Sequence, residues 1–368
     1  MPLRIAIIGS RGYPYVYSGY ETFVKELSER LIKNDFSVTI YCHKNLFSNF
    51  PKSVNGINLV YIRTIEKKSL SQFIHSFSSI LHASLRNFDL IFVVNSANGP
   101  FGLITKLLGK KTVINVDGVE WMRPKWKGVG NKYFYYASKL ATKLFNEIVT
   151  DSYEMQKIYR DEFNARSTVI SYGANNSKTY HSGFISKWPL TEKQYYLVVG
   201  RLIPDNNSDL IISEFRASKS KKKLVIVGDV PYKDKFAERI KATNDERIIF
   251  TGYIYNETEL MELYVNCFSY IHGHEFGGTN PTILSALANN CAVLALDTRF
   301  SRETLDNGKY GLFFNKNPGN LNTMINFIEV NPDVIERLRR ISRNRIEENY
   351  TWEKVTNQYI SLFKKIFS

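Results

Sequence analysis

Apolar residues are grouped along this chain in short runs, and segments with helical spacing separate the runs. The first run covers residues 3–8 and ends at Gly9. A run of this length is typical of a strand that is buried on both faces of a parallel sheet. Further runs predict strands at residues 37–41, 58–62, 90–94, 112–115 and 147–150. Apolar positions spaced by three and four residues predict helices at 21–33, 70–86 and 131–146.

The pattern weakens between residues 172 and 194 and then begins again. Gly173, Gly183 and Pro189 lie among polar residues there, so we interpret this stretch as a linker. Beyond it the sequence predicts strands at 195–199, 223–227, 247–250, 268–271 and 292–296, and helices at 207–215 and 352–367.

Strands that alternate with helices in two successive arrays predict an α/β protein with two facing Rossmann-like domains. We expect one domain at residues 1–174, with the C-terminal helix 351–368 packing back on it, and a second at 175–350. Ligands of open α/β sheets bind beyond the carboxyl ends of the strands. The cleft between the two domains is therefore the expected ligand site.

The composition adds a strong positive charge to this picture. Lys and Arg number 49 against 35 Asp and Glu in the 368 residues, a formal net charge of +14. Such a surplus favours anionic partners, namely nucleotides, nucleic acids or acidic membrane surfaces. The apolar content of 43% argues against a disordered chain.

The cysteines and the N-terminus indicate a reducing compartment. Cys42, Cys267 and Cys291 are far apart in sequence, lack metal-ligand spacing, and are an odd number for a disulfide framework. Residues 1–4 lead directly into the first strand, so we expect no signal peptide. No apolar run reaches the ~18 residues that span a bilayer. We therefore expect a cytoplasmic protein, with any membrane contact peripheral.

The loop after the first strand is the first candidate site. It comprises residues 9–14 and 18–21, and Gly19, Tyr20 and Glu21 lead into a helix. Backbone N–H groups can approach a ligand in a glycine-rich turn near a helix N-terminus. Its glycine spacing is not that of dinucleotide-binding loops, and a purely structural loop is the alternative.

Residues 115–126 form a second candidate loop after a strand. Asp117 and Glu120 offer carboxylates to sugar hydroxyls, while Trp121 and Arg123 offer a ring face and a cation. The alternative is a loop that its tryptophans hold by packing.

A third candidate follows the first strand of the second array. Arg201 directly follows this strand and Gly200, where a guanidinium can meet a phosphate with paired donors. Asn206 lies in the same loop. The alternative is a surface Arg201 that pairs with Asp205.

The most informative segment covers residues 272–281. We expect Asn280 to cap the following helix and Pro281 to take its first position. Free N–H groups around Gly277, Gly278, Thr279 and Asn280 would then form an anion site. Glu275 is placed to accept hydrogen bonds from sugar hydroxyls. The two histidines of this segment lack further ligands, so we expect no metal.

A basic amphipathic stretch is the last candidate. Lys132, Lys139 and Lys143 share one helical face, and six cations precede them. These six are Lys106, Lys110, Lys111, Arg123, Lys125 and Lys127. The stretch favours docking on anionic lipid, and a merely solvated basic face is the alternative.

Together these segments resemble the retaining glycosyltransferases of family four, which have the GT-B fold. The segments at 198–211, 225–229, 247–254 and 286–298 resemble the donor domain of that family, and those at 150–159 and 169–175 resemble the end of its acceptor domain. The segments at 5–27, 117–126 and 272–288 are similar to bacterial rhamnosyltransferases of capsule and cell-wall polysaccharide assembly. The resemblance implies transfer with retention and without metal or other cofactor. It also implies a nucleoside-diphosphate sugar donor, dTDP-rhamnose, and a lipid-linked saccharide acceptor.

The resemblance also implies residue roles. Arg201 would contact the donor diphosphate, Gly19 would lie beside the donor phosphate, and Glu275 would lie near the transferred sugar. Two positions depart from the family pattern, because Asn206 replaces the usual Lys and Ser285 replaces a glutamate that holds the ribose. The implied donor-binding set is Gly19, Arg201, Asn206, Glu275, Gly277, Gly278, Thr279, Asn280 and Ser285. The candidate acceptor-binding set is Tyr20, Glu21, Asp117, Glu120, Trp121 and Arg123.

The mechanism that we expect is dissociative, with Arg201 and Glu275 at the donor and either Asp117 or Glu120 orienting the acceptor. Three alternatives stay open at this point. One is a hexosyltransferase that uses a UDP- or GDP-sugar. Another is a nucleotide-sugar-binding homologue with impaired catalysis, which Ser285 motivates. The third is a nucleic-acid-binding protein, although the sequence has no recognisable reading motif and we expect no nucleic-acid partner.

Overall fold

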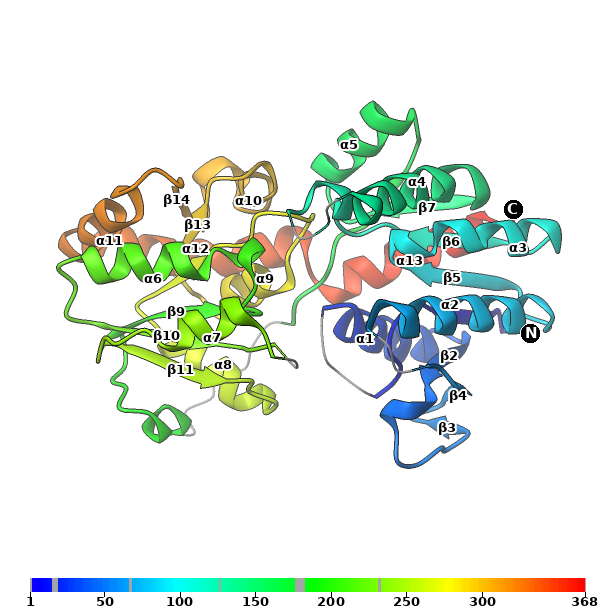
Figure 1. Ribbon diagram of the computed structural model, residues 1–368, viewed down its shortest axis with the longest axis horizontal. Coiled ribbons are helices and arrows are strands. Elements are labelled where there is room, and N and C mark those ends of the chain that lie inside the picture. The colour runs from blue at the N-terminus through cyan, green and yellow to red at the C-terminus, as the bar shows by residue number, and fades with distance from the viewer. Residues whose placement is uncertain are drawn as a thin grey trace. The chain divides into compact units, whose positions relative to one another are not determined.

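The chain consists of two compact units in a computed structural model (Figure 1). The structure describes residues 2–14, 19–65, 68–124, 126, 128–175, 183–230 and 233–367. One unit comprises Met1–Tyr172 with Trp352–Ser368, and the other comprises Gly173–Thr351. The sequence predicted boundaries after residues 174 and 350, within two residues of those in the structure.

The N-terminal unit contains a sheet whose central strands are fully buried. Its strands are β1 (Arg4–Ile8), β2 (Ser37–His43), β3 (Ser53–Val54), β4 (Ile57–Ile62), β5 (Leu90–Val94), β6 (Thr112–Asn115), β7 (Glu147–Thr150) and β8 (Thr168–Val169). They lie in the order β3-β4-β2-β1-β5-β6-β7-β8. Every pairing is parallel except that of β3 with β4. Burial on both faces explains why these strands are continuous apolar runs.

Helices cover both faces of this sheet. They are α1 (Gly19–Lys33), α2 (Lys68–Ser84), α3 (Gly102–Leu107), α4 (Val129–Leu144), α5 (Tyr153–Phe163) and α13 (Trp352–Lys365). The C-terminal helix α13 packs back on this unit, since the ring of Tyr359 lies 5.6 Å from that of Phe23. The hydroxyl of Tyr359 accepts a hydrogen bond of 2.9 Å from Nδ2 of Asn115. The last segment of the chain therefore completes the core of the first unit.

The C-terminal unit has the same architecture with an all-parallel sheet. Its strands are β9 (Tyr195–Val199), β10 (Lys223–Val227), β11 (Ile248–Gly252), β12 (Ser269–His272), β13 (Val293–Leu296) and β14 (Leu312–Phe314). They lie in the order β11-β10-β9-β12-β13-β14. Its helices are α6 (Ser208–Ala217), α7 (Lys235–Lys241), α8 (Glu257–Asn266), α9 (Pro281–Ala288), α10 (Arg299–Thr304), α11 (Asn320–Val330) and α12 (Pro332–Asn349). In both units the loops that leave the carboxyl ends of parallel strands gather at one edge.

Two of the cysteines meet in this second unit. Cys267 and Cys291 lie two residues before the neighbouring strands β12 and β13, and their Sγ atoms lie 3.7 Å apart. Both thiols are free and buried. Sequence distance hid this contact, because parallel strands bring together residues that a whole helix separates.

A stacked pair of buried histidines lies in the N-terminal unit. The rings of His43, at the end of β2, and His75, on α2, lie 3.7 Å apart. Burial, followed by the charge of Arg11, lowers the pKa of His43 to about 4, against a hydrogen bond with Gln72 that raises it. Burial and the neighbouring His43 lower the pKa of His75 to about 3. Both rings are therefore neutral in the native protein near neutral pH.

We expect these histidines to make the protein less stable in acid. An unfolded histidine takes up a proton near pH 6.5, while these two resist protonation until pH ~4 or below. Native stability is thus present above pH 6.5 and falls as the pH drops toward 4, by up to about 1.4 kcal/mol per pH unit for each ring. Between pH 7.5 and 4.5, thermal unfolding should show a smaller loss of native stability in His75→Gln than in the natural chain.

The matched control is His82→Gln, because His82 is partly exposed and its pKa is lowered much less deeply by burial. If both variants lose stability with pH as steeply as the natural chain does, the stacked pair does not titrate as we expect.

Candidate functional site

The guanidinium of Arg201 is open to solvent at the carboxyl end of β9. Arg201 is exposed, whereas the next residues, Leu202 and Ile203, are buried and anchor the loop. Within the described part of the chain its side chain forms no ion pair or hydrogen bond. Asp205, the partner considered from the sequence, is itself buried. Arg201 is thus a fixed cation whose donors remain available to a ligand.

Asn206 ties this loop to the loop that follows β12. Its Nδ2 donates to the carbonyl of Arg201 at 2.7 Å, and its Oδ1 lies 2.7 Å from Nδ1 of His274. The two loops approach so closely that a Cβ on Gly273 would lie 2.3 Å from the backbone carbonyl oxygen of Asn206. The Asn206 side chain, which is expected to bind the donor, therefore also positions the backbone of Arg201. Its Oδ1 atom is already engaged by His274.

Glu275 forms an ion pair that the sequence did not reveal. Its Oε2 lies 2.5 Å from Nζ of Lys316, in the loop between β14 and α11. Its backbone N–H donates to the carbonyl of Asp205 at 3.1 Å, which fixes it beside the Arg201 loop. Lys316 had no local signal, because its proximity to Glu275 depends on the strand order β12-β13-β14. The cations Arg201 and Lys316 and the carboxylate of Glu275 all lie at this strand edge.

The start of α9 confirms the expected cap. Oδ1 of Asn280 accepts hydrogen bonds from the backbone N–H of Thr282 at 2.9 Å and from its hydroxyl at 2.8 Å. Pro281 occupies the first helical position. The cap satisfies one of the N–H groups that a helix leaves unpaired at its start.

The loop expected to bind an anion lies against α10. Gly277, Gly278 and Thr279 are buried, and Phe300, Ser301 and Thr304 of α10 line a space together with Gly277, Gly278 and Asn280. The anion site that the sequence predicts in this loop stays a prediction, and α10 is the element that would border it.

Ser285 and the histidines of this loop complete the inventory. Ser285 is half-buried on α9, where its carbonyl accepts from Nδ2 of Asn289 at 2.7 Å. Burial lowers the pKa of His272 to about 3, so its ring is neutral. No group of three or more His, Cys, Asp or Glu side chains among the described residues is placed to hold a metal ion.

In the N-terminal unit the centre of the candidate site is Asp117, which follows β6. Its Oδ2 accepts a hydrogen bond of 2.7 Å from the hydroxyl of Tyr172, and its carbonyl accepts one of 3.3 Å from Tyr20. The register of β6 with β7 pairs Asn115 with Val149, and so places Asp117 level with the buried Asp151. Two carboxyl groups thus meet at the carboxyl edge of neighbouring strands.

Burial makes Asp117 a better proton acceptor. It raises the pKa of the carboxyl group, while hydrogen bonds from Tyr172 and Asp151 and the charge of Arg123 offset part of this rise. Burial and the charge of Asp117 raise the pKa of Tyr20 and Tyr172, which therefore stay protonated as donors. Asp151 and Tyr172 are site residues that sequence reasoning missed. Both lie within segments quoted for the resemblance, but nothing local marked their side chains.

The loop after Asp117 is held by its own contacts. Oε1 of Glu120 lies 2.9 Å from Nε of Arg123, and Oε2 accepts a hydrogen bond of 2.7 Å from Trp126. Arg123 is buried, and Trp121 is 8% exposed. Around Trp121 pack the rings of Tyr135, Tyr159 and Phe163. Trp121 and Arg123 are thus engaged in packing and charge pairing, Glu120 is engaged in contacts within its loop, and the acceptor roles expected for these residues stay predictions.

Glu21 is likewise a structural residue. It is 3% exposed and accepts a hydrogen bond of 3.0 Å from the backbone N–H of Arg11. The Arg11 guanidinium lies 3.7 Å from the same carboxylate. Glu21 therefore fixes the loop after β1, and its expected contact with the acceptor stays a prediction. Gly19 and Tyr20 begin α1, while residues 15–18 of this loop lie outside the described residues.

Two family models match the two parts of the chain. Residues 3–175 match a domain of unknown function, DUF1972. Residues 184–348 match the family described as glycosyl transferases group 1. The two matches lie in the N-terminal and the C-terminal unit respectively.

Two curated proteins are similar over part of their length. One is N-acetylgalactosamine-N,N'-diacetylbacillosaminyl-diphospho-undecaprenol 4-alpha-N-acetylgalactosaminyltransferase of Campylobacter jejuni, 25% identical over 61% of this chain and 62% of the relative. The other is a probable sucrose-phosphate synthase of Thermosipho melanesiensis, 25% identical over 62% of this chain and 56% of the relative. The chain thus matches about six tenths of the length of these relatives.

Solved structures establish the fold. Sucrose-phosphate synthase of Thermosynechococcus elongatus superposes with a TM-score of 0.82 at 15% identity, covering 99% of each chain. HepE of Anabaena, in complex with UDP, superposes with a TM-score of 0.76 at 14% identity, covering 99% of this chain and 100% of HepE. The expected GT-B fold with two Rossmann-like sheets is confirmed.

Proposed function

We propose that this protein transfers a sugar from a nucleoside-diphosphate donor, because residues 184–348 match the family described as glycosyl transferases group 1. The observation that carries the proposal is the exposed, unpaired Arg201, which the Asn206 bridge holds beside the Glu275–Lys316 pair. Two fixed cations at one strand edge suit a diphosphate. The neighbouring carboxylate suits sugar hydroxyls.

The N-terminal unit would orient the acceptor hydroxyl. Asp117 is half-buried and fixed by Tyr172, and its pKa is raised by burial. A carboxylate of this kind holds a hydroxyl in one orientation through a charge-assisted hydrogen bond. A lipid-linked saccharide acceptor is supported by the relative from Campylobacter jejuni, whose name specifies a diphospho-undecaprenol substrate.

The proposed step is dissociative and retains configuration. The bond between the anomeric carbon and the leaving phosphate oxygen breaks, and the electron pair stays on the diphosphate. Arg201 and Lys316 stabilise this charge, and such electrostatic stabilisation is usually the largest contribution to catalysis. The acceptor oxygen then bonds to the anomeric carbon from the same face, and its proton passes to the leaving phosphate oxygen.

The donor sugar that we propose is rhamnose from dTDP-rhamnose, on the resemblance of the loop segments. The compared proteins favour the wider class, since their names specify an N-acetylgalactosaminyltransferase and a sucrose-phosphate synthase. A hexosyltransferase that uses a UDP- or GDP-sugar is therefore the second candidate.

The structure also supports the peripheral contact with anionic membrane that we propose. Exposed apolar residues follow one face of α2 and continue just beyond its end, namely Phe73, Phe77 and Leu81 on α2 and then Leu85. Helices α2, α3 and α4 lie side by side on the N-terminal unit (Figure 1). Leu103 and Leu107 on α3 and Tyr136 and Leu140 on α4 are also exposed. We call these eight residues the apolar face.

Exposed lysines accompany the apolar face. They are Lys106, Lys111, Lys132, Lys139 and Lys143. Of the other cations in the predicted basic stretch, Arg123 is buried, while Lys125 and Lys127 lie outside the described residues. Apolar side chains with surrounding lysines suit a surface of anionic lipid. None of the described helices is both long and apolar enough to cross a bilayer.

The first test concerns the donor. We expect dTDP and dTDP-rhamnose to raise the melting temperature, because a ligand at 100 times its Kd stabilises the native state by about 2.7 kcal/mol. Thermal unfolding with a panel of dTDP, UDP and GDP sugars measures this. Stabilisation by UDP or GDP sugars alone would overturn the rhamnosyl assignment and leave the wider class.

The second test concerns the cations at the donor. Arg201→Ala should lower turnover by ~100-fold or more, the size of effect seen when one donor to developing charge is removed. Lys316→Gln should lower turnover in the same assay. Lys309→Gln is the matched control, because Lys309 is an exposed lysine of the same unit that lies away from Glu275. Turnover in Arg201→Ala that equals the control would remove Arg201 from the mechanism.

The third test concerns the apolar face. Leu107→Ser should weaken binding to vesicles of phosphatidylglycerol and phosphatidylcholine several-fold, since a leucine that enters lipid contributes about 1.5–3 kcal/mol when fully buried. Leu107 is 77% exposed, as is Val330 in the other unit, so Val330→Ser is the matched control. Equal binding of the two variants at low and high salt would show that α3 does not touch the membrane.

A further inference from the structure

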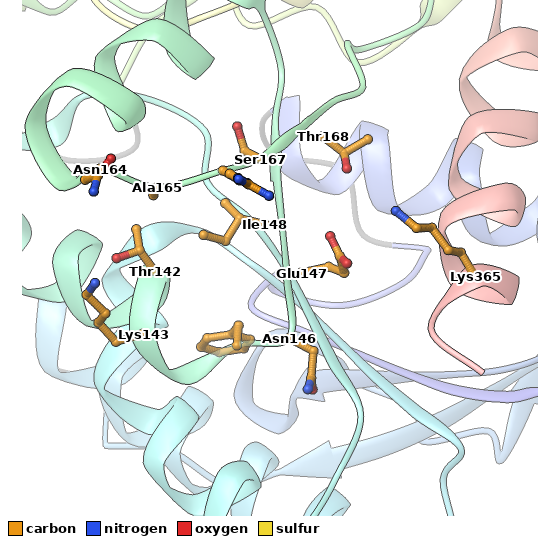
Figure 2. Close-up of a pocket in the computed structure, with 12 residues that line it drawn as sticks. Thr142, Lys143, Asn146, Glu147, Ile148, Asn164, Ala165, Ser167, Thr168 and Lys365 are labelled. Carbon is orange, nitrogen blue, oxygen red and sulfur yellow. The ribbon is translucent and has the colours of Figure 1, made fainter. Parts of the chain in front are cut away.

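A polar pocket of about 480 Å³ lies at the amino ends of β7 and β8. Glu147 and Thr168, the first residues of these strands, line it, as Figure 2 shows. Asp117 lies beyond the opposite, carboxyl end of the neighbouring strand β6. The pocket is therefore separate from the candidate acceptor site, and its volume lies within the range of ligand pockets.

Three cations from three separate segments converge on this pocket. They are Lys143 in the last turn of α4, Arg166 in the loop before β8, and Lys365 in the last turn of α13. Glu147 is the one acidic residue among those that line it. Figure 2 shows Lys143 and Lys365 on opposite sides of Glu147. Lys143 and Arg166 are exposed, and neither pairs with a carboxylate of the described chain.

Hydrogen-bond donors complete the lining. Oδ1 of Asn146 accepts from the N–H of Thr112 at 2.8 Å and from its hydroxyl at 3.0 Å. This contact fixes the amide and leaves its NH₂ group without a partner among the described residues. Asn164 holds a left-handed backbone conformation at the end of α5 and also lines the pocket. Fixed amide donors and cations together suit an anion with several acceptor oxygens.

We propose that this pocket binds a phosphate group. Lysines in the last turns of α4 and α13 also complement the helix dipoles, but that role does not require Arg166 to meet them from a third segment. The phosphate could belong to a lipid headgroup or to a soluble phosphate ester. The lipid source is supported by the neighbourhood, because Lys143 shares α4 with Tyr136 and Leu140 of the apolar face. The backbone carbonyl of Lys143 also accepts a hydrogen bond from Lys106 on α3.

The experiment compares three charge variants in an Arg201→Ala background, which removes one of the two cations of the proposed donor site and so weakens it as a competing anion site. Arg166→Gln should weaken binding of glycerol phosphate roughly tenfold, as expected for loss of a charge-assisted contact. Glu147→Gln should strengthen it about threefold, because a neighbouring like charge disappears. Lys139→Gln is the control, since Lys139 is an exposed lysine on α4 that does not line the pocket. Calorimetry measures the Kd values, and circular dichroism checks that each variant folds.

The same variants are then tested on vesicles of phosphatidylglycerol and phosphatidylcholine. Saturable binding of glycerol phosphate that follows the expected order supports a soluble phosphate as ligand. The expected order on vesicles alone supports the lipid headgroup. If Arg166→Gln and Lys139→Gln have equal effects in both arms and Glu147→Gln has none, the proposal is overturned. With Arg201 intact, Arg166→Gln should leave donor turnover unchanged, so this result is independent of the proposed transfer reaction.

Discussion

Parallel pairing of strands that are buried on both faces is the constraint on which this molecule depends. Each strand must be followed by a helix that crosses back over the sheet, so every strand of an array ends at the same edge. The loops at that edge can carry polar residues because they are the one part of the layer that the helices do not cover. In the C-terminal unit this brings Arg201, after β9, next to Glu275, after the adjacent strand β12. In the N-terminal unit it brings Asp117, after β6, level with Asp151, after β7.

The two edges solve different electrostatic problems. The C-terminal edge keeps Arg201 exposed and pairs the second cation, Lys316, with Glu275. The edge therefore presents positive charge, and neither cation is both poorly solvated and unpaired. At the N-terminal edge, burial raises the pKa of Asp117, and phenolic donors hold the carboxylate in place. A negative group that is poorly solvated and fixed by hydrogen bonds attracts a neutral hydroxyl more effectively than one in free water does.

The sequence predicted the buried strands well and the side-chain environments poorly. Strands β5, β6, β7, β9 and β10 begin and end where their apolar runs do. The strands that were missed, β3, β8 and β14, have only two or three residues and are mostly half-exposed, too short for a pattern to emerge. Lys316 could not be found, because its contact with Glu275 depends on strand order across two crossovers. The ring packing of Trp121 could not be predicted, because a tryptophan in a polar loop has the same sequence signal whether its ring faces a sugar or a core.

The loop of Gly277 and Gly278 lies against α10, and the neighbouring loops add side-chain charge at the same edge. Gly277 has a φ of 114°, a backbone conformation that favours glycine, and both glycines line a space that Phe300 also lines. Arg201 and Lys316 are cations that the described loops place at this edge with Glu275. Asn206 stands where a Lys is usual in the family that the chain resembles. A third cation there would repel the other two, whereas the neutral amide bonds to the Arg201 carbonyl and to His274, and so links the two loops without adding charge.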